Sequence, residues 1–158
     1  MFGRVVPAPR LEAWYGDEGA SYTYSGLAHE PLPWTHELHE LRSRVESETG
    51  ASFNSVLANL YRDGNDSNGW HADDEDELGA EPIIASLSFG TPRRFLLRHR
   101  ASRETVELAL NPGSLLVMRG LTQQCWQHSI PKQRAVHQAR INLTFRRVVT
   151  HGCSEWQH

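Results

Sequence analysis

Residues 68–79, NGWHADDEDELG, place a histidine and a carboxylate two positions apart, at His71 and Asp73. Imidazole nitrogens and carboxylate oxygens both bind transition metals, and side chains two apart on a strand point the same way. The pair could therefore bind one metal ion. Chance alone produces about one such pair in a chain with nine histidines and 19 acidic residues, so an ordinary acidic surface loop is the alternative.

A triad of two histidines and one carboxylate needs a further histidine, and it leaves metal positions open for substrates. His128 lies in QQCWQHSIPKQR, after the segment GSLLVM and before a turn proline, so it could reach the metal from across a barrel. Spacing alone leaves its role open between metal ligand and surface residue. His99 in a basic strand, His137 in a charged loop and His151 near the end of the chain fit the surface better.

The segment ARINLTFRR, residues 139–147, carries two arginines that could bind an acid. Arginine on a strand face is costly to bury unless an anion meets it. Because each guanidinium can bind a carboxylate through two hydrogen bonds, Arg140 and Arg146 could hold a short dicarboxylate between them. The alternative is a solvent-exposed edge strand. Strand alternation places Arg140, Asn142, Thr144 and Arg146 on one face, and Ile141, Leu143 and Phe145 on the other.

A second polar strand face is found in LANLY, where Leu57, Asn59 and Tyr61 share one side. An amide and a phenol together suit the wall of a binding site, although a half-buried strand with ordinary polar residues is equally natural. A metal triad with open positions beside a clamp for a dicarboxylate is what a 2-oxoglutarate-dependent oxygenase requires.

The spacing of apolar residues changes along the chain from a helical pattern to strand alternation, and it predicts the elements that must position these residues. One helix is predicted over about residues 34–49, since Pro33 stands at its start and Gly50 at its end. Leu38, Leu41 and Val45 recur within it at helical spacing. Earlier, Tyr22 and Tyr24 alternate as on a short strand.

After the helix, short β-rich segments separated by turn residues follow one another. They are SFNSVLANLYRDG, PIIASLSFG, RFLLRH, TVELAL, GSLLVM and ARINLTFRRV. Several short strands after a helical start predict a mainly β fold with supporting helices. The pattern favours a double-stranded β-helix, or jelly-roll.

The composition is typical of a single globular domain of 158 residues. No apolar run is long enough to span a membrane, and MFGRVVPAPRLEAWYG has no apolar signal segment, so we expect no membrane partner. Cys125 and Cys153 form no disulfide framework, which predicts an intracellular location. This would be the cytoplasm in a bacterium and could be the nucleus in a eukaryote.

The net charge of −3 does not predict a nucleic-acid binder. The charge is uneven, however, since five arginines crowd residues 93–103 while acids gather at 73–77. Such an arginine cluster is either solvated surface or a stripe that contacts phosphates.

Taken together, these motifs resemble the AlkB family of iron(II)/2-oxoglutarate dioxygenases, which reverse alkylation damage on nucleobases. The likeness is nearer to the mammalian DNA-repair homologues, through YTYSG, WHADDE, PIIASLSFG and NLTFRR. It covers about Phe2 to Val148 and implies a cupin-like jelly-roll dioxygenase core. The order that carries it is Asn59-x-Tyr61, His71-x-Asp73, His128 and Arg140-x-Asn142-x-Thr144-Phe145-Arg146.

The resemblance implies a role for each matching residue. Iron would be held by His71, Asp73 and His128, and 2-oxoglutarate would be bound by Asn59, Tyr61, Arg140 and Arg146, with Leu57 and Asn142 lining the site. Arg146 would hold the end nearer the metal. The substrate base would meet Trp14, Tyr22, Tyr24 and Glu75, the last at an exocyclic amine.

The implied reaction is oxidative demethylation of bases such as 1-methyladenine and 3-methylcytosine in single- or double-stranded DNA, with RNA also open. It consumes O₂ and 2-oxoglutarate and releases formaldehyde. The base must be unpaired or flipped. Residues 93–103, with Lys132 and Arg134, would meet phosphates, and Phe2 could fill the gap left by the flipped base.

We expect a monomer with one domain over residues 1–158, divided into a nucleotide-recognition segment, 1–32, and a helix plus jelly-roll core, 33–148. Two alternatives remain open. One is a 2-oxoglutarate-dependent hydroxylase of a protein side chain. The other is a non-catalytic β-barrel binding module, against which the complete set of His71, Asp73, His128 and Arg140 argues.

Overall fold

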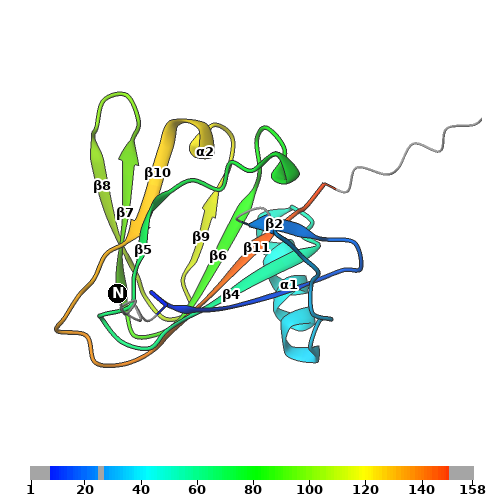
Figure 1. Ribbon diagram of the computed structural model, residues 1–158, viewed down its shortest axis with the longest axis horizontal. Coiled ribbons are helices and arrows are strands. Elements are labelled where there is room, and N and C mark those ends of the chain that lie inside the picture. The colour runs from blue at the N-terminus through cyan, green and yellow to red at the C-terminus, as the bar shows by residue number, and fades with distance from the viewer. Residues whose placement is uncertain (1–7, 25–26, 150–158) are drawn as a thin grey trace, which may run out of the picture.

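Two antiparallel sheets face each other in the computed structural model (Figure 1). The structure describes residues 8–24 and 27–149; for residues 22–24 and 27–29 it describes the backbone alone. The main sheet contains, in spatial order, β1 (Leu11–Gly16), β4 (Ser55–Tyr61), β11 (Arg140–Arg146), β6 (Ile84–Gly90) and β9 (Leu115–Met118). The second sheet contains β5 (Asn68–His71), β10 (Trp126–Ile130), β7 (Arg93–His99) and β8 (Thr105–Leu110). The remaining elements are the pair β2 (Tyr22–Tyr24) and β3 (Leu27–His29), the helices α1 (His36–Thr49) and α2 (Thr122–Cys125), and the 3-10 turn η1 (Asp76–Leu78).

This arrangement confirms the predicted mainly β jelly-roll core with supporting helices. Neighbouring strands in each sheet are mostly distant in sequence, so the chain crosses repeatedly between the two sheets. The strand β1, which precedes residue 33, also belongs to the main sheet, because it pairs with β4 along its whole length. No helix in the described ranges has both the length and the apolar character needed to cross a membrane.

The helix α1 confirms the predicted helix, although it begins at His36 instead of residue 34. Thr35 explains the difference, because its extended backbone and its hydroxyl, which accepts from the amide of Leu38 at 3.2 Å, cap the first turn. Gly50, at φ 68°, ends the helix in the left-handed conformation that glycine adopts without strain.

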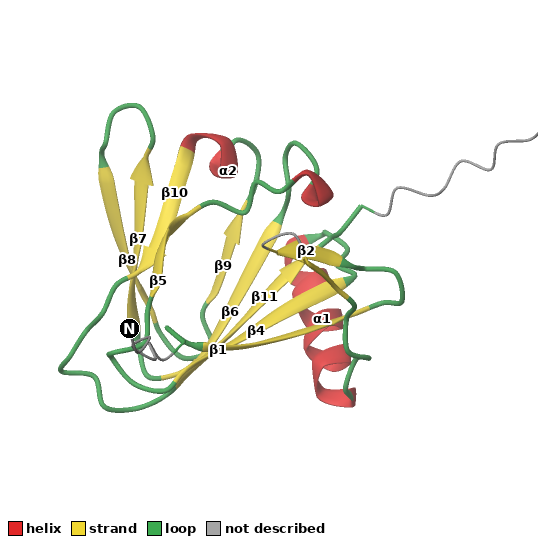
Figure 2. Ribbon diagram, viewed as in Figure 1, coloured by secondary structure: helices red, strands yellow, loops and turns green. Residues whose placement is uncertain are grey.

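The main sheet has one apolar and one polar face. Its outer face packs against α1, as Figure 2 shows, and Val45 of the helix joins Val56, Leu143 and Phe145 in a buried cluster. Its inner face is polar and yet buried, since Arg140 is only 1% exposed. The predicted alternation along β11 is therefore confirmed, while the alternative of an edge strand is wrong because β11 lies between β4 and β6.

The sequence did not predict β1, β5 or β10. In all three the apolar alternation is broken by polar or small residues, as in NGWH and WQHSI. They are held by pairing with partners far away in the sequence, and this pairing leaves no local pattern.

Gly64, in the loop between β4 and β5, supports a test of the fold. Its amide donates to the carbonyl of Val136 at 2.8 Å, and its carbonyl accepts from the amide of Gln133 at 2.8 Å. A Cβ at this position would lie 1.7 Å from the Gln133 carbonyl oxygen. We expect Gly64→Ala to lower the free energy of unfolding by about 3 kcal/mol, measured by urea titration.

Gly69→Ala is the matched control, because a Cβ at Gly69 meets nothing within 4 Å. It should change the free energy of unfolding by less than about 0.5 kcal/mol. Equal effects of the two substitutions would contradict the close approach of the two loops.

Candidate active site

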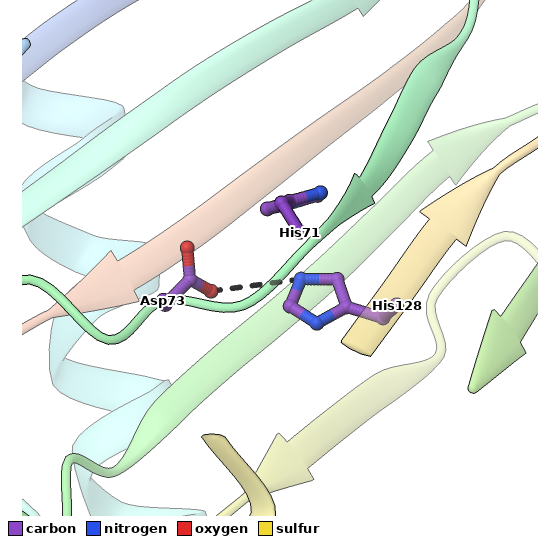
Figure 3. Close-up of side chains that lie close together, drawn as sticks. All are labelled: His71, Asp73 and His128. Carbon is purple, nitrogen blue, oxygen red and sulfur yellow. Dashed lines mark ion pairs between the residues drawn. The ribbon is translucent and has the colours of Figure 1, made fainter. Parts of the chain in front are cut away.

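Two histidines and one aspartate meet between the sheets. His71 ends β5 and lies opposite His128 of β10, and Asp73 follows two residues after His71. One potential ligand atom from each of the three lies within 4.8 Å of the others. Figure 3 shows the three side chains turned toward one another.

The chain therefore brings the predicted triad together, but not in the predicted way. Because β5 ends at His71, Asp73 does not share a strand face with it. Asp73 is placed instead by contacts that start elsewhere in the chain. Its amide donates to Gln123 Oε1 at 2.9 Å, and its Oδ1 accepts from Arg146 Nη2 at 2.5 Å.

The carboxylate of Asp73 is 3% exposed, and its Oδ2 lies 3.7 Å from Nε2 of His128. Burial by itself raises the pKa of this group, but the charge and hydrogen bond of Arg146, with lesser contributions from the two histidines, outweigh burial and hold the pKa below its usual value. Asp73 is therefore ionised at neutral pH and can act as a metal ligand.

Both histidines can offer a lone pair to an ion. Burial lowers the pKa of His128 to about 4 against the opposing charge of Asp73, so its ring is neutral at pH 7. In His71, Nδ1 lies 2.7 Å from the carbonyl of Gly69, which can only accept. In the neutral ring the proton is therefore on Nδ1, and Nε2 keeps the lone pair.

The other candidate histidines lie apart from this group. His99 packs edge-on against Trp126, with 5.0 Å between ring centroids. His137 is exposed in a loop. His151 lies outside the described residues, as does Phe2.

Arg140 forms the second part of the site. Its Nη2 donates to Ser88 Oγ at 2.9 Å, and its guanidinium carbon lies 5.2 Å from the centroid of the Tyr61 ring. Its Nε and Nη1 are buried and have no hydrogen-bond partner among the residues described here. Burial lowers the pKa of Arg140 and raises that of Tyr61. A buried cation with unpaired donors indicates a binding site for an anion.

Strand register places the polar residues of β4 and β11 side by side. Tyr61 lies opposite Arg140, Asn59 opposite Asn142, and Leu57 opposite Thr144. Asn59 Nδ2 donates to Asn142 Oδ1 at 3.4 Å, and Thr144 Oγ1 donates to the same oxygen at 2.8 Å. The predicted polar wall thus exists and is tied together by hydrogen bonds.

A cavity of about 510 Å³ joins the two parts of the site. Glu75, which follows Asp73 by two residues, lies on its wall, and Trp14 contributes from β1 while its indole donates to the carbonyl of Ala20 at 3.0 Å. Tyr22 and Tyr24 form the predicted short strand, β2, and their side chains are outside the described part of the structure. The predicted residues that line the cavity are Trp14, Leu57, Asn59, Tyr61, His71, Asp73, Glu75, His128, Arg140, Asn142 and Arg146.

Sequence reasoning missed several residues of this site. Ser86 accepts from Asn142 Nδ2 at 2.7 Å, and Ser88 accepts from Arg140. Their alternation with apolar residues in PIIASLSFG was a usable signal. Arg10, whose Nε donates to Asn59 Oδ1 at 2.9 Å, and Gln123 gave no local signal.

The predicted phosphate contact is wrong for Arg93. Its side chain is 1% exposed and donates to the carbonyls of Asp63, Asp66 and Pro131 at 2.8–3.0 Å. It therefore ties loops together inside the protein. Other arginines of that stretch are partly exposed, and Arg98 lies 4.0 Å from the ring centroid of Trp70.

Comparisons with known proteins agree with this geometry. A family model described as "2OG-Fe(II) oxygenase superfamily" matches residues 3–146. "Alpha-ketoglutarate-dependent dioxygenase alkB homolog 3" of Rattus norvegicus is 48% identical over 154 residues, which cover 91% of this chain and 52% of the relative. "DNA oxidative demethylase ALKBH2" of Bos taurus is 46% identical over 157 residues, covering 94% and 56%. The chain thus spans about half the length of these curated relatives.

A solved structure, "The structure of OsALKBH1", has the same fold. It matches with a TM-score of 0.64 at 16% identity, over 93% of this chain and 84% of that one.

The buried His128 predicts a pH dependence of stability in the metal-free protein. The unfolded chain takes up a proton at His128 below a pKa of 6.5, whereas the folded ring stays neutral down to about pH 4. The free energy of unfolding is therefore unaffected by protonation of His128 above pH 6.5, and it decreases as the pH falls from 6.5 toward 4, because only the unfolded chain gains a proton there. Between pH 7 and 4.5 the free energy of unfolding of the wild type should therefore decrease by about 2 kcal/mol more than that of His128→Gln, measured by urea unfolding.

The range from pH 7.5 to 9 serves as the internal control, because His128 is neutral there in both states and the difference between the two proteins should stay constant. Parallel profiles down to pH 4.5 would show that His128 is not buried in its neutral form.

Proposed function

Since the chain belongs to the 2OG-Fe(II) oxygenase superfamily, as a member of its AlkB family, we propose that it oxidatively demethylates N-alkylated bases in DNA. Iron(II), 2-oxoglutarate and O₂ would take part in the reaction. The observation that carries the proposal is the meeting of the three metal-binding side chains and the unpaired guanidinium of Arg140 in one cavity.

His71, Asp73 and His128 fit the metal. Two neutral imidazoles and one ionised carboxylate are the ligand set of non-haem iron(II) oxygenases, which leaves positions open for the cosubstrate and O₂. Arg146 holds Oδ1 of Asp73, and Oδ2 is turned toward His128. The carboxylate is thereby kept ionised and in a fixed rotamer before any ion arrives.

The polar face of β4 and β11 fits 2-oxoglutarate. Arg140 would bind one carboxylate through its unpaired Nε and Nη1. Tyr61 and Asn59 would donate hydrogen bonds beside it, while Asn142 and Leu57 shape the wall. Arg146 would bind the end of 2-oxoglutarate that lies nearer the metal. Because it also donates to Asp73, its charge would stabilise both the cosubstrate and the metal ligand.

The bound iron, cosubstrate and O₂ would supply the oxidising power that turns an N-methyl group into an N-hydroxymethyl group. That product loses formaldehyde and restores the base. The task of the protein is to place the methyl carbon near the metal and to exclude water. Trp14, Tyr22 and Tyr24 would stack against the base, and Glu75 would accept from its exocyclic amine.

DNA is the proposed substrate because a relative at 46% identity is named a DNA oxidative demethylase. Trp14 and Glu75 on the cavity wall suit a base better than an aliphatic side chain. Action on RNA, a flipped base, a monomer, an intracellular location and one domain over residues 1–158 remain predictions. Lys132 and Arg134, both exposed, remain candidates for phosphate contacts.

The direct test measures formaldehyde release from oligonucleotides carrying 1-methyladenine or 3-methylcytosine, with iron(II) and 2-oxoglutarate. We expect release with the wild type and none with His71→Ala, because His71 supplies a metal ligand. His39→Ala, which removes an exposed histidine of α1, is the control and should keep full activity.

Each contrary result points to an alternative. If 2-oxoglutarate is consumed while no oligonucleotide is demethylated, a protein side chain becomes the substrate to test. If iron and 2-oxoglutarate together do not raise the melting temperature, the non-catalytic binding module becomes the alternative to test.

A second prediction concerns Arg140. Because its guanidinium should pair with a carboxylate, Arg140→Ala should raise the KM for 2-oxoglutarate by roughly 10–100-fold and leave the Kd for methylated DNA unchanged. Arg44→Ala, at an exposed position on α1, should change neither constant. A parallel shift of both constants in Arg140→Ala would remove Arg140 from the cosubstrate site.

A further inference from the structure

The segment from Ala72 to Ala80 carries Asp73 and Glu75 but forms no strand, so no sheet ladder fixes it. Residues of the short helix α2, Arg100 and Val149 hold it instead, the last by donating its amide to the carbonyl of Glu77 at 2.7 Å. Gln124 Nε2 donates to the carbonyl of Ala80 at 2.8 Å. Arg100, just after β7, donates through Nη2 to Asp74 Oδ2 at 2.8 Å. These contacts fix the outer side of the segment, away from the cavity.

Gln123 makes the inner contact. Its side chain is 1% exposed, and its Oε1 accepts from the amide of Asp73 at 2.9 Å. Its Nε2 lies 3.5 Å from Met118 Sδ, a weak acceptor. A buried amide is costly unless it is hydrogen-bonded, so the strongest contact of this side chain is the one to Asp73.

We infer that Gln123 is a positioning residue for the metal site, a role that rests on the iron-binding function proposed above. It acts through the backbone of Asp73 and touches neither metal nor substrate. The carboxylate of Asp73 is fixed at Oδ1 by Arg146, but this contact cannot set the position of the Cα atom. Gln123 supplies the second point of attachment, and the two together aim Oδ2 at His128.

The same stretch of chain also places the third ligand. Gln123 lies on α2, and β10 follows directly with His128. Movement of α2 would therefore shift both the backbone of Asp73 and the start of the strand that carries His128. The positions of two proposed metal ligands thus depend on the same short helix.

Removing the hydrogen bond should weaken metal binding. Polar partners that orient metal ligands typically contribute 10–100-fold in affinity. Gln123→Met keeps the length of the side chain but puts a methyl group where the oxygen accepts from the Asp73 amide, so we expect the Kd for Mn²⁺ to rise about 10-fold or more. Gln123→Glu keeps an oxygen at the acceptor position, and because burial without a cationic partner among the described residues favours its neutral, protonated form, it should restore most of the affinity.

Gln124→Met is the matched control. Gln124 is the neighbouring residue of the same helix and binds the same segment, but at Ala80 and not at a metal ligand. Because Gln124 is exposed, this substitution tests the attachment of α2 to the segment without changing the buried packing around Gln123. We expect Gln124→Met to keep the wild-type Kd for Mn²⁺.

The experiment titrates the metal-free proteins with Mn²⁺ and follows free ion by electron paramagnetic resonance, with thermal unfolding recorded in parallel. Activity assays then separate metal binding from cosubstrate binding. Gln123→Met should need a higher iron(II) concentration, while its KM for 2-oxoglutarate stays at the wild-type value. Should Gln123→Met fail to fold, Gln123→Asn takes its place with the same expectations, because its shorter amide cannot reach Asp73.

An unchanged Kd in Gln123→Met, or an equal rise in Gln124→Met, would overturn the inference and leave the proposed function standing. A Gln123→Glu protein that binds Mn²⁺ as weakly as Gln123→Met would also overturn it, since packing would then be what matters. A wild type that binds no Mn²⁺ would overturn the proposed function and this inference with it.

Discussion

The buried ion pair between Arg146 and Asp73 is the constraint on which the site depends. It joins β11, a central strand of the main sheet, to the segment that follows β5 of the second sheet. It thus bridges the two walls of the cavity beside His71 and His128. Two charges held between sheets are tolerated only when each meets a partner, and such pairs fix geometry more than they add net stability. Asp73 is ionised and oriented because Arg146 is there, and the rest of the metal site is arranged around that carboxylate.

The main sheet separates stability from function by its two faces. On the outer face, Phe53, Val56 and Phe145 are at most 1% exposed and pack beneath α1, which gives the fold its apolar core. The inner face is thereby free to carry amides, hydroxyls and guanidinium groups. Because side chains alternate along β11, each core residue is flanked by a cavity residue, as Phe145 is by Thr144 and Arg146. Disturbing the core would therefore shift the site by way of the same strand.

Local patterns allowed the sequence to predict α1, the faces of β4 and β11, and the jelly-roll class. Long-range register decided the rest. Nothing near His128 shows that β10 pairs with β5 to set it opposite His71, and nothing near Asp73 shows that Gln123 holds its backbone. Such pairings are defined only once distant strands have found each other. The same limit applies to Arg93. Its charge predicts a surface residue, and only the folded structure brings together the three loop carbonyls that accept from it.

Arg93 and Arg140 show how the roles of two buried arginines can be told apart. Both are 1% exposed, and their guanidinium carbons lie 5.5 and 5.2 Å from the centroid of the same ring, that of Tyr61. Arg93 donates to three backbone carbonyls and to Gln133 Oε1, so the protein satisfies its hydrogen-bond donors. Arg140 meets one hydroxyl and keeps two unpaired nitrogens within the described structure. Since both arginines are equally inaccessible to solvent, the visible difference lies in the number of acceptors that the fold provides. A guanidinium that keeps unpaired donors on the wall of a cavity suits an anion that enters the cavity, which is the role proposed for Arg140 toward the acid cosubstrate.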